Sequence, residues 1–157
     1  MTGTQLMNEN DVFLDVDAST KEELFSFIAR EAARLGVTRD PEGLAGDLMD
    51  RENQISTGLT DGFAIPHAKS DHVDHVEVFF IRTLAPIAWE TMDGDEAGFF
   101  FVLLVPRENE GNIHLQMISA LAVCLLEDDF KSEVKSCADA RELTDYITKH
   151  VQLEQLA

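Results

Sequence analysis

Cysteine and long apolar runs are scarce in this sequence. Its 157 residues include only two cysteines, Cys124 and Cys137, whose separation fits no C-x-x-C metal or redox motif. We therefore expect two reduced thiols, as in a reducing compartment. The longest apolar run, Phe99–Val105, has seven residues, whereas a membrane span needs roughly 18 to 20. Because Met1–Asp11 has neither a basic residue nor an apolar segment, we also expect no secretory signal.

Basic residues are few as well. Twelve Lys and Arg stand against 30 Asp and Glu, which gives a net charge of −18. Such a charge repels a phosphate backbone, so we expect no nucleic-acid binding. Hydrophobic residues still make up 45% of the chain and include ten Phe, which is enough for a core. With no repeat and no Pro-, Gly- or Ser-rich linker, residues 1–157 are expected to form a single cytoplasmic domain.

Short β-rich runs predict the strands of a sheet. They cover residues 12–16, 63–65, 76–83 and 99–106, with a further short strand expected around Trp89. The two runs 76–83 and 99–106 have apolar side chains on both faces, as in a sheet covered on both sides. No helical crossover fits between these two strands, so the sheet is expected to be mixed. The sequence thus predicts an α/β fold with a mixed sheet of about five strands, flanked by helices on both faces.

Capping signals and apolar stripes predict four helices. The expected helices run from the Ser19 capping box to about Leu35, from Asp40-Pro41 to about Arg51, from Asn112 to Leu126, and from Arg141 to about Val151. Capping boxes at 19–22 and 139–142 mark the starts of the first and last of them. The acidic stretches 93–96 and 127–129 are interpreted as solvated turns.

His67 is the first candidate for chemistry. It follows the segment Phe63-Ala64-Ile65-Pro66, where a strand end and the fixed φ of proline can hold an imidazole in place. A neutral imidazole can act as a nucleophile near pH 7 and form a covalent intermediate. On spacing alone, an ordinary loop histidine is the better interpretation.

Donors that could bind a phosphoryl group on His67 occur on both sides of it in the sequence. The candidates are Arg51, Ser56, Thr57, Gly58, Gly62 and His114. Arg51 offers planar guanidinium donors, the two hydroxyls can donate, and the glycines let backbone N–H groups approach closely. His114 can bring a ring N–H and a helix N-terminus to the same anion. Taken alone, Arg51 is better explained by a surface ion pair at a helix end, and His114 by a partly buried core edge.

The order of several motifs carries more weight than any one of them. They are Arg51-Glu52, Ser56-Thr57-Gly58-Leu59, Gly62-Phe63-Ala64-Ile65-Pro66-His67-Ala68, the Trp89 segment, the strand ending at Pro106, and His114-Leu115. In this order, from about Val12 to His150, the sequence resembles the enzyme IIA domain of the fructose and mannitol family. That family belongs to the bacterial phosphoenolpyruvate-dependent sugar phosphotransferase system.

The resemblance implies a role for each site residue. His67 would be the phosphorylated histidine, which accepts a phosphoryl group from the phosphocarrier HPr and passes it to a cysteine of the cognate enzyme IIB. Enzyme IIB in turn serves the membrane enzyme IIC. Arg51 and His114 would be the site neighbours, and no cofactor or metal is implied. We expect Arg51, with Lys69 or loop N–H groups, to offset the acidic charge around His67.

The sequence departs from the family pattern at two places. Thr60-Asp61 stands where Gly followed by a small polar residue is common, and the stretch after the site contains His72 and His75. The first departure bears on the shape of the loop, and the second on the choice of partner.

Other functions were weighed from the same residues. One is a regulatory module, phosphorylated on the same histidine, which signals its state to other proteins. Another is a metal site at His67, His72 and His75, but the step from His67 to His72 matches neither one strand face nor one helix face. A hydrolase would need G-x-S-x-G and a nucleotide kinase a P-loop, and the sequence contains neither.

Overall fold

A five-stranded sheet forms the centre of the chain. The computed structural model describes residues 7–108 and 113–151. The strands are β1 (Val12–Val16), β2 (Phe63–Ala64), β3 (His67–Ser70), β4 (Glu77–Ala88) and β5 (Glu96–Pro106). The helices are η1 (Glu9–Asp11, a 3-10 turn), α1 (Lys21–Arg34), α2 (Pro41–Gln54), α3 (Ile113–Cys124), α4 (Asp128–Ser136) and α5 (Ala140–Val151).

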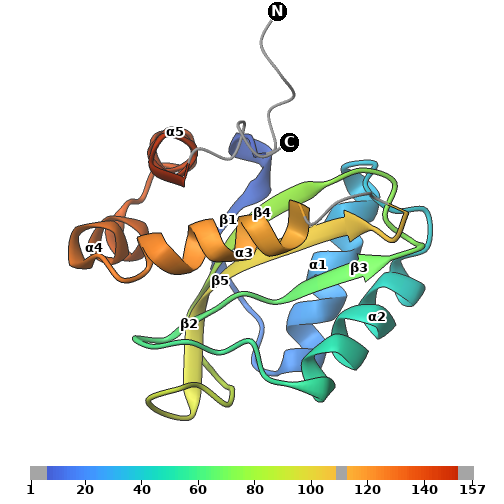
Figure 1. Cartoon of the computed structure of the whole chain (residues 1–157), viewed down its shortest axis with the longest axis horizontal. Coiled ribbons are helices and arrows are strands. Elements are labelled where there is room, and N and C mark those ends of the chain that lie inside the picture. Colours follow the sequence, from blue (N-terminus) through green and yellow to red (C-terminus); the bar gives the residue numbers. More distant parts are fainter. Residues whose placement is uncertain (1–6, 109–112, 152–157) are drawn as a thin grey trace, which may run out of the picture.

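The sheet is mixed, as the sequence predicts. Its order is β1-β4-β5-β2, and β3 pairs with β5 on the same edge as β2 (Figure 1). Strands β4 and β5 are antiparallel, whereas β1 is parallel to β4, and both β2 and β3 are parallel to β5. The antiparallel pair follows from its short connection, which leaves no room for a crossover helix.

Helices cover both faces of this sheet. One core cluster joins α1 and α2 to one face, through residues such as Phe79 and Phe100, and the other joins α3, α4 and α5 to the opposite face, through Phe80 and Phe101. Figure 1 shows α3 in front of the sheet, with α1 behind it. The alternation of these phenylalanines between two buried faces explains why residues 78–81 of β4 and 99–105 of β5 are apolar without interruption.

The helix ends show where local chemistry sets the boundaries. Asp40 caps α2 by accepting the Gly43 N–H at 3.0 Å, as predicted. In α1 the cap lies one residue later than predicted, because Thr20 accepts the Glu23 N–H at 3.1 Å while Glu23 accepts the Ser19 N–H. Helix α2 continues to Gln54, so Arg51 lies in its last turn and not past its end.

Two elements are missing from the sequence prediction. Residues 127–129 were interpreted as a solvated turn, but Asp128 and Asp129 form the first turn of α4, whose Phe130 and Val134 are buried. Strand β3 was also missed, because its sequence, His-Ala-Lys-Ser, has little β propensity. The strand expected around Trp89 is instead the end of β4, which reaches Ala88.

Two carboxyl groups lie buried together beside β1 and β4. Asp11 is 1% exposed and Glu77 is 9% exposed, and His75 Nε2 lies 3.3 Å from Glu77 Oε1. Burial, the hydrogen bond to Asp11 and the negative charge of Asp11 raise the pKa of Glu77 to about 9. The pair therefore holds a proton at neutral pH.

Glu77→Gln is expected to change how stability depends on pH. Between the ordinary carboxyl pKa of 4.5 and about 9, the folded wild type binds more protons than the unfolded chain, so its stability falls as pH rises. The amide removes this linkage. Thermal unfolding should show the variant gaining several degrees in Tm relative to wild type between pH 5 and pH 8.5. The exposed Glu90→Gln is the control, and an equal difference at both pH values would contradict this account.

Candidate functional site

His67 stands where the edge strand of the sheet is interrupted. Pro66 separates β2 from β3 and has no N–H to offer the ladder, while its carbonyl accepts the Leu103 N–H at 3.0 Å. The Ile65 carbonyl is thereby free to face the imidazole, and it lies 2.9 Å from His67 Nδ1. Because a carbonyl only accepts, Nδ1 carries the proton in the neutral ring. Nε2 is therefore the nitrogen with a free lone pair.

The surroundings of His67 favour its neutral form. Burial lowers the pKa of His67, and the positive charges of Arg51 and His114 lower it further. The hydrogen bond to Ile65 and the negative charge of Glu52 oppose this decrease. The imidazole is therefore neutral at pH 7 and has a nucleophilic nitrogen available.

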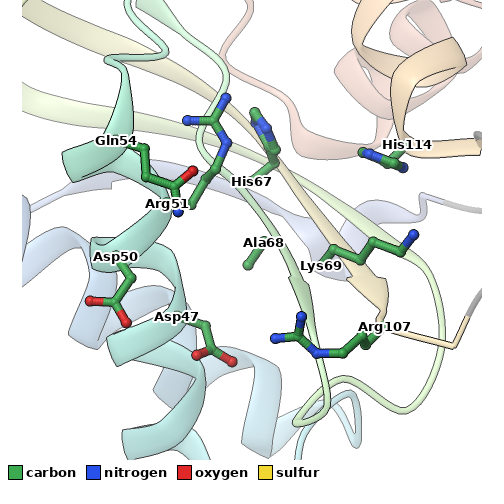
Figure 2. Close-up of a pocket in the computed structure, with 9 residues that line it drawn as sticks. All are labelled: Asp47, Asp50, Arg51, Gln54, His67, Ala68, Lys69, Arg107 and His114. Carbon is green, nitrogen blue, oxygen red and sulfur yellow. The ribbon is translucent and has the colours of Figure 1, made fainter.

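The ring borders a cavity of about 350 Å³. Helix α2 contributes Arg51, and β3 contributes His67 and Lys69. Arg107, directly after β5, and His114, in the first turn of α3, complete the set of basic side chains. Figure 2 shows Arg51 and His114 on either side of His67, with Lys69 and Arg107 below. Three cations, Arg51, Lys69 and Arg107, thus gather around the two imidazoles, with the carboxylates of Asp47 and Asp50 on the α2 side of the cavity. This arrangement suits an anion.

Arg51 and His114 approach the cavity in different ways. One guanidinium nitrogen of Arg51, Nη1, donates to the Ile55 carbonyl at 2.9 Å and so fixes the side chain across the end of α2. His114 is half-buried, and its Nδ1 is buried without a hydrogen-bond partner among the residues that the structure describes. Burial and the charge of Lys69 lower the pKa of His114. A buried ring nitrogen without a hydrogen-bond partner is costly.

The other four candidates lie outside the lining of this cavity. Ser56 Oγ donates to the Glu90 carbonyl and accepts the Gly58 N–H, and Thr57 donates through N–H and Oγ1 to the Glu52 carboxylate. These hydroxyls are engaged in holding the loop. The structure brings Arg51, His67 and His114 together, but not Ser56, Thr57, Gly58 or Gly62.

Both glycines are required by the shape of the loop. A Cβ on Gly58 would lie 2.2 Å from the Glu90 carbonyl oxygen. Gly62 and Asp61 have φ of 80° and 57°, and the Phe63 N–H donates to the Thr60 carbonyl across them. This is the geometry of a tight two-residue turn that favours Asp-Gly, so the unusual Thr60-Asp61 sequence still forms a regular turn.

Several residues of the cavity were missed by the sequence analysis. Asp47, Asp50 and Gln54 line it together with Arg51, at the i, i+3, i+4 and i+7 spacing of one helix face. That periodicity could have found them. Arg107 carried no signal beyond its place in a polar loop after β5.

His72 and His75 do not join His67. His72 Nδ1 lies 3.4 Å from Asp40 Oδ2, and His75 pairs with Glu77. Over residues 7–108 and 113–151, no group of three or more His, Cys, Asp or Glu side chains has the arrangement of a metal site. Cys124 and Cys137 are both free thiols. No helix in those same ranges is long and apolar enough to cross a membrane.

Comparison with known proteins shows the family. The model of the phosphoenolpyruvate-dependent sugar phosphotransferase system, EIIA 2, matches residues 5–150, so the chain belongs to this family of phosphoryl carriers. The fructose-specific EIIA component of the phosphotransferase system from Haloferax volcanii is 30% identical, over 90% of this chain and 91% of the relative. The chain spans less than a quarter of the length of other, longer curated relatives.

Solved structures have the same fold. Nitrogen regulatory protein IIA-Ntr from Neisseria meningitidis superposes with a TM-score of 0.84, at 29% identity, and covers 91% of this chain and 97% of its own. Enzyme IIAMtl, in its complex with phosphorylated enzyme IIBMtl from Escherichia coli, gives a TM-score of 0.71 at 20% identity, covering 91% of this chain and 94% of its own. The mixed five-stranded sheet between two helical layers is therefore the fold of this family.

Proposed function

We propose that this chain accepts a phosphoryl group on His67 Nε2 from phosphorylated HPr and passes it to a cysteine of a cognate enzyme IIB. The observation that supports the proposal is the contact between His67 Nδ1 and the Ile65 carbonyl, which leaves Nε2 unprotonated beside a cationic cavity. Capture of IIAMtl with phosphorylated IIBMtl in one complex supports the choice of enzyme IIB as partner. We place the relay in the cytoplasm.

The transfer needs little covalent machinery. As Nε2 attacks, the P–N bond of the donor breaks, and its electron pair returns to the donor nitrogen while a new P–N bond forms on His67. The proton stays on Nδ1 throughout and remains hydrogen-bonded to the Ile65 carbonyl. Transfer then depends on in-line positioning and on compensation of the phosphoryl charge. We assign this compensation to Arg51 and His114, with Lys69 and Arg107 as further cations, and give Ser56, Thr57, Gly58 and Gly62 the role of shaping the loop.

A reconstituted relay tests the proposal. The protein is incubated with phosphoenolpyruvate, enzyme I and HPr, and the phosphorylated form is then mixed with a IIB protein whose gene lies beside its own. We expect an acid-labile phosphoryl group on the chain, followed by its appearance on the cysteine of IIB. Phosphorylated HPr that fails to transfer to the chain would overturn the function.

The similarity to IIA-Ntr supports a second candidate. Its TM-score of 0.84 exceeds that of IIAMtl, and it is named as a nitrogen regulatory protein. In this alternative, His67 is phosphorylated in the same way, but the phosphorylation state controls other proteins. The two functions differ at the second step, because a regulator would accept the phosphoryl group from HPr but would not pass it to a IIB protein.

The rate of phosphoryl uptake should depend on pH in a predictable way. A histidine whose pKa is lowered stays neutral to a lower pH than a free imidazole, which is half protonated at about pH 6.5. Single-turnover uptake by His67 should therefore be constant from pH 8 down to about 6.5 and should decline only below that. An NMR titration of the His67 ring on the unphosphorylated protein provides the reference. An uptake midpoint and a ring pKa both above about 6.5 would contradict this interpretation.

A further inference from the structure

The buried carboxylate of Glu52 is a feature that the phosphoryl-transfer chemistry leaves unexplained. Glu52 follows Arg51 on α2, and successive residues of a helix point about 100° apart, so Arg51 faces the cavity while Glu52 points into the core. The Glu52 residue is 4% exposed. Burying a carboxylate is expensive unless hydrogen bonds compensate for the lost water.

Three donors supply that compensation. Glu52 Oε2 accepts the Thr57 N–H at 2.7 Å and the Trp89 Nε1–H at 3.1 Å, and Oε1 accepts the Thr57 hydroxyl at 2.7 Å. The Trp89 ring is itself fixed in the core, 4.9 Å from the Phe100 ring and 5.8 Å from the Phe25 ring. The carboxylate thus ties the end of α2, the site loop and the end of β4 to one another.

A continuous series of hydrogen bonds leads from this carboxylate to the nucleophile. Glu52 holds Thr57, the Thr57 carbonyl accepts the Ile65 N–H at 3.1 Å, and the Ile65 carbonyl lies 2.9 Å from His67 Nδ1. Ile65 is therefore held from both sides, and the direction of its carbonyl determines which ring nitrogen carries the proton. A displacement of Thr57 would turn that carbonyl and disturb the imidazole.

We propose that Glu52 is a positioning residue for His67. Through Thr57 and Ile65 it fixes the ring as the Nδ1–H tautomer and directs Nε2 into the cavity. Its charge also acts on the ring, because the negative charge of Glu52 raises the pKa of His67 against the effect of Arg51. The inference rests on the proposed function for its kinetic consequence, but its structural part concerns the unphosphorylated ring alone.

Glu52→Gln tests this role because the amide keeps the shape of the side chain but loses the charge and one acceptor oxygen. Long-range ¹H–¹⁵N NMR of the unphosphorylated protein should show the Nδ1–H tautomer of His67 in wild type. The variant should show a mixture of both tautomers and a lower His67 pKa. Phosphoryl uptake should slow roughly tenfold to a hundredfold, as expected for a misplaced reacting group.

Glu77→Gln is the matched control. This variant also replaces a buried carboxyl group by an amide, but Glu77 lies outside the cavity and outside the series of hydrogen bonds. The NMR spectrum of the His67 ring in Glu77→Gln should match that of wild type. Because the ring spectrum needs no phosphoryl donor, it distinguishes failure of this proposal from failure of the relay.

A wild-type tautomer and pKa of His67 in folded Glu52→Gln would overturn the proposal, as would an equal change in Glu77→Gln. If Glu52→Gln does not fold, Thr57→Val provides the test, since it removes one of the two Thr57 bonds and retains the carboxylate. We then expect a reduced Nδ1–H fraction and uptake that is slower by severalfold. An unchanged ring spectrum in Thr57→Val would also overturn the proposal.

Discussion

The His67→Ala variant is expected to take up no phosphoryl group from phosphorylated HPr. The reaction needs a neutral nitrogen with a free lone pair next to the cationic cavity, and His67 Nε2 supplies it. His114 does not replace it, since it lies across the cavity at the start of α3 (Figure 2), away from the edge-strand position where the donor would align with His67. Intact mass spectrometry under neutral conditions measures the result.

His72→Ala is the matched control for this variant. His72 lies five residues further along the chain and pairs with Asp40, outside the cavity. Its removal should leave uptake at the wild-type level. Persistent phosphorylation of His67→Ala, or its loss in His72→Ala, would place the acceptor elsewhere.

The second large effect is expected for Arg51→Ala, which should slow phosphoryl uptake by about 10²- to 10³-fold, the range for loss of one preorganised charge-stabilising donor. The phosphoryl group brings negative charge into a chain of net charge −18, and Arg51 offers planar N–H donors beside the ring. Stability should hardly change, because within residues 7–108 and 113–151 the side chain donates one hydrogen bond, which is exposed, to the Ile55 carbonyl. Rapid-quench kinetics and thermal unfolding measure the two quantities.

Arg39→Ala controls for loss of positive charge alone. Arg39 is exposed, pairs with Asp74 at 3.2 Å and does not line the cavity around His67. The Arg39→Ala variant should take up the phosphoryl group at close to the wild-type rate. A wild-type rate in Arg51→Ala would remove Arg51 from the site, and an equal decrease in Arg39→Ala would point to the overall charge of the chain.

The fold was largely predictable because the pattern of apolar residues along the sequence marks the positions that become buried. The lack of a helical crossover between the two apolar runs that became β4 and β5 predicted a mixed sheet, and the sheet is mixed, with β4 and β5 antiparallel. Strand β3 was not predictable in the same way, since its ladder with β5 is made by the backbone and requires no particular side chains. Helix α4 was hidden by its acidic first turn, where carboxylates favour a helix N-terminus as well as a solvated turn.

The residues of the site were predictable only where a sequence motif contained them. Arg51, His67 and His114 were chosen from the sequence and line one cavity. The roles of the loop residues could not be chosen in that way, because Ser56 and Thr57 have the chemistry to bind phosphate and also to hold a loop. Which of these they do depends on Glu90 and Glu52, with which they form hydrogen bonds. Only the folded chain shows those contacts.

The most direct test is to identify the phosphorylated nitrogen. The ¹⁵N-labelled protein is phosphorylated with phosphoenolpyruvate, enzyme I and HPr, and its histidine rings are observed by long-range ¹H–¹⁵N NMR at neutral pH. We predict one phosphorylated histidine, His67, with phosphorus on Nε2 and a proton on Nδ1. Phosphorus on Nδ1, on another histidine, or on none while HPr is phosphorylated would contradict the assignment of His67 Nε2 as the acceptor.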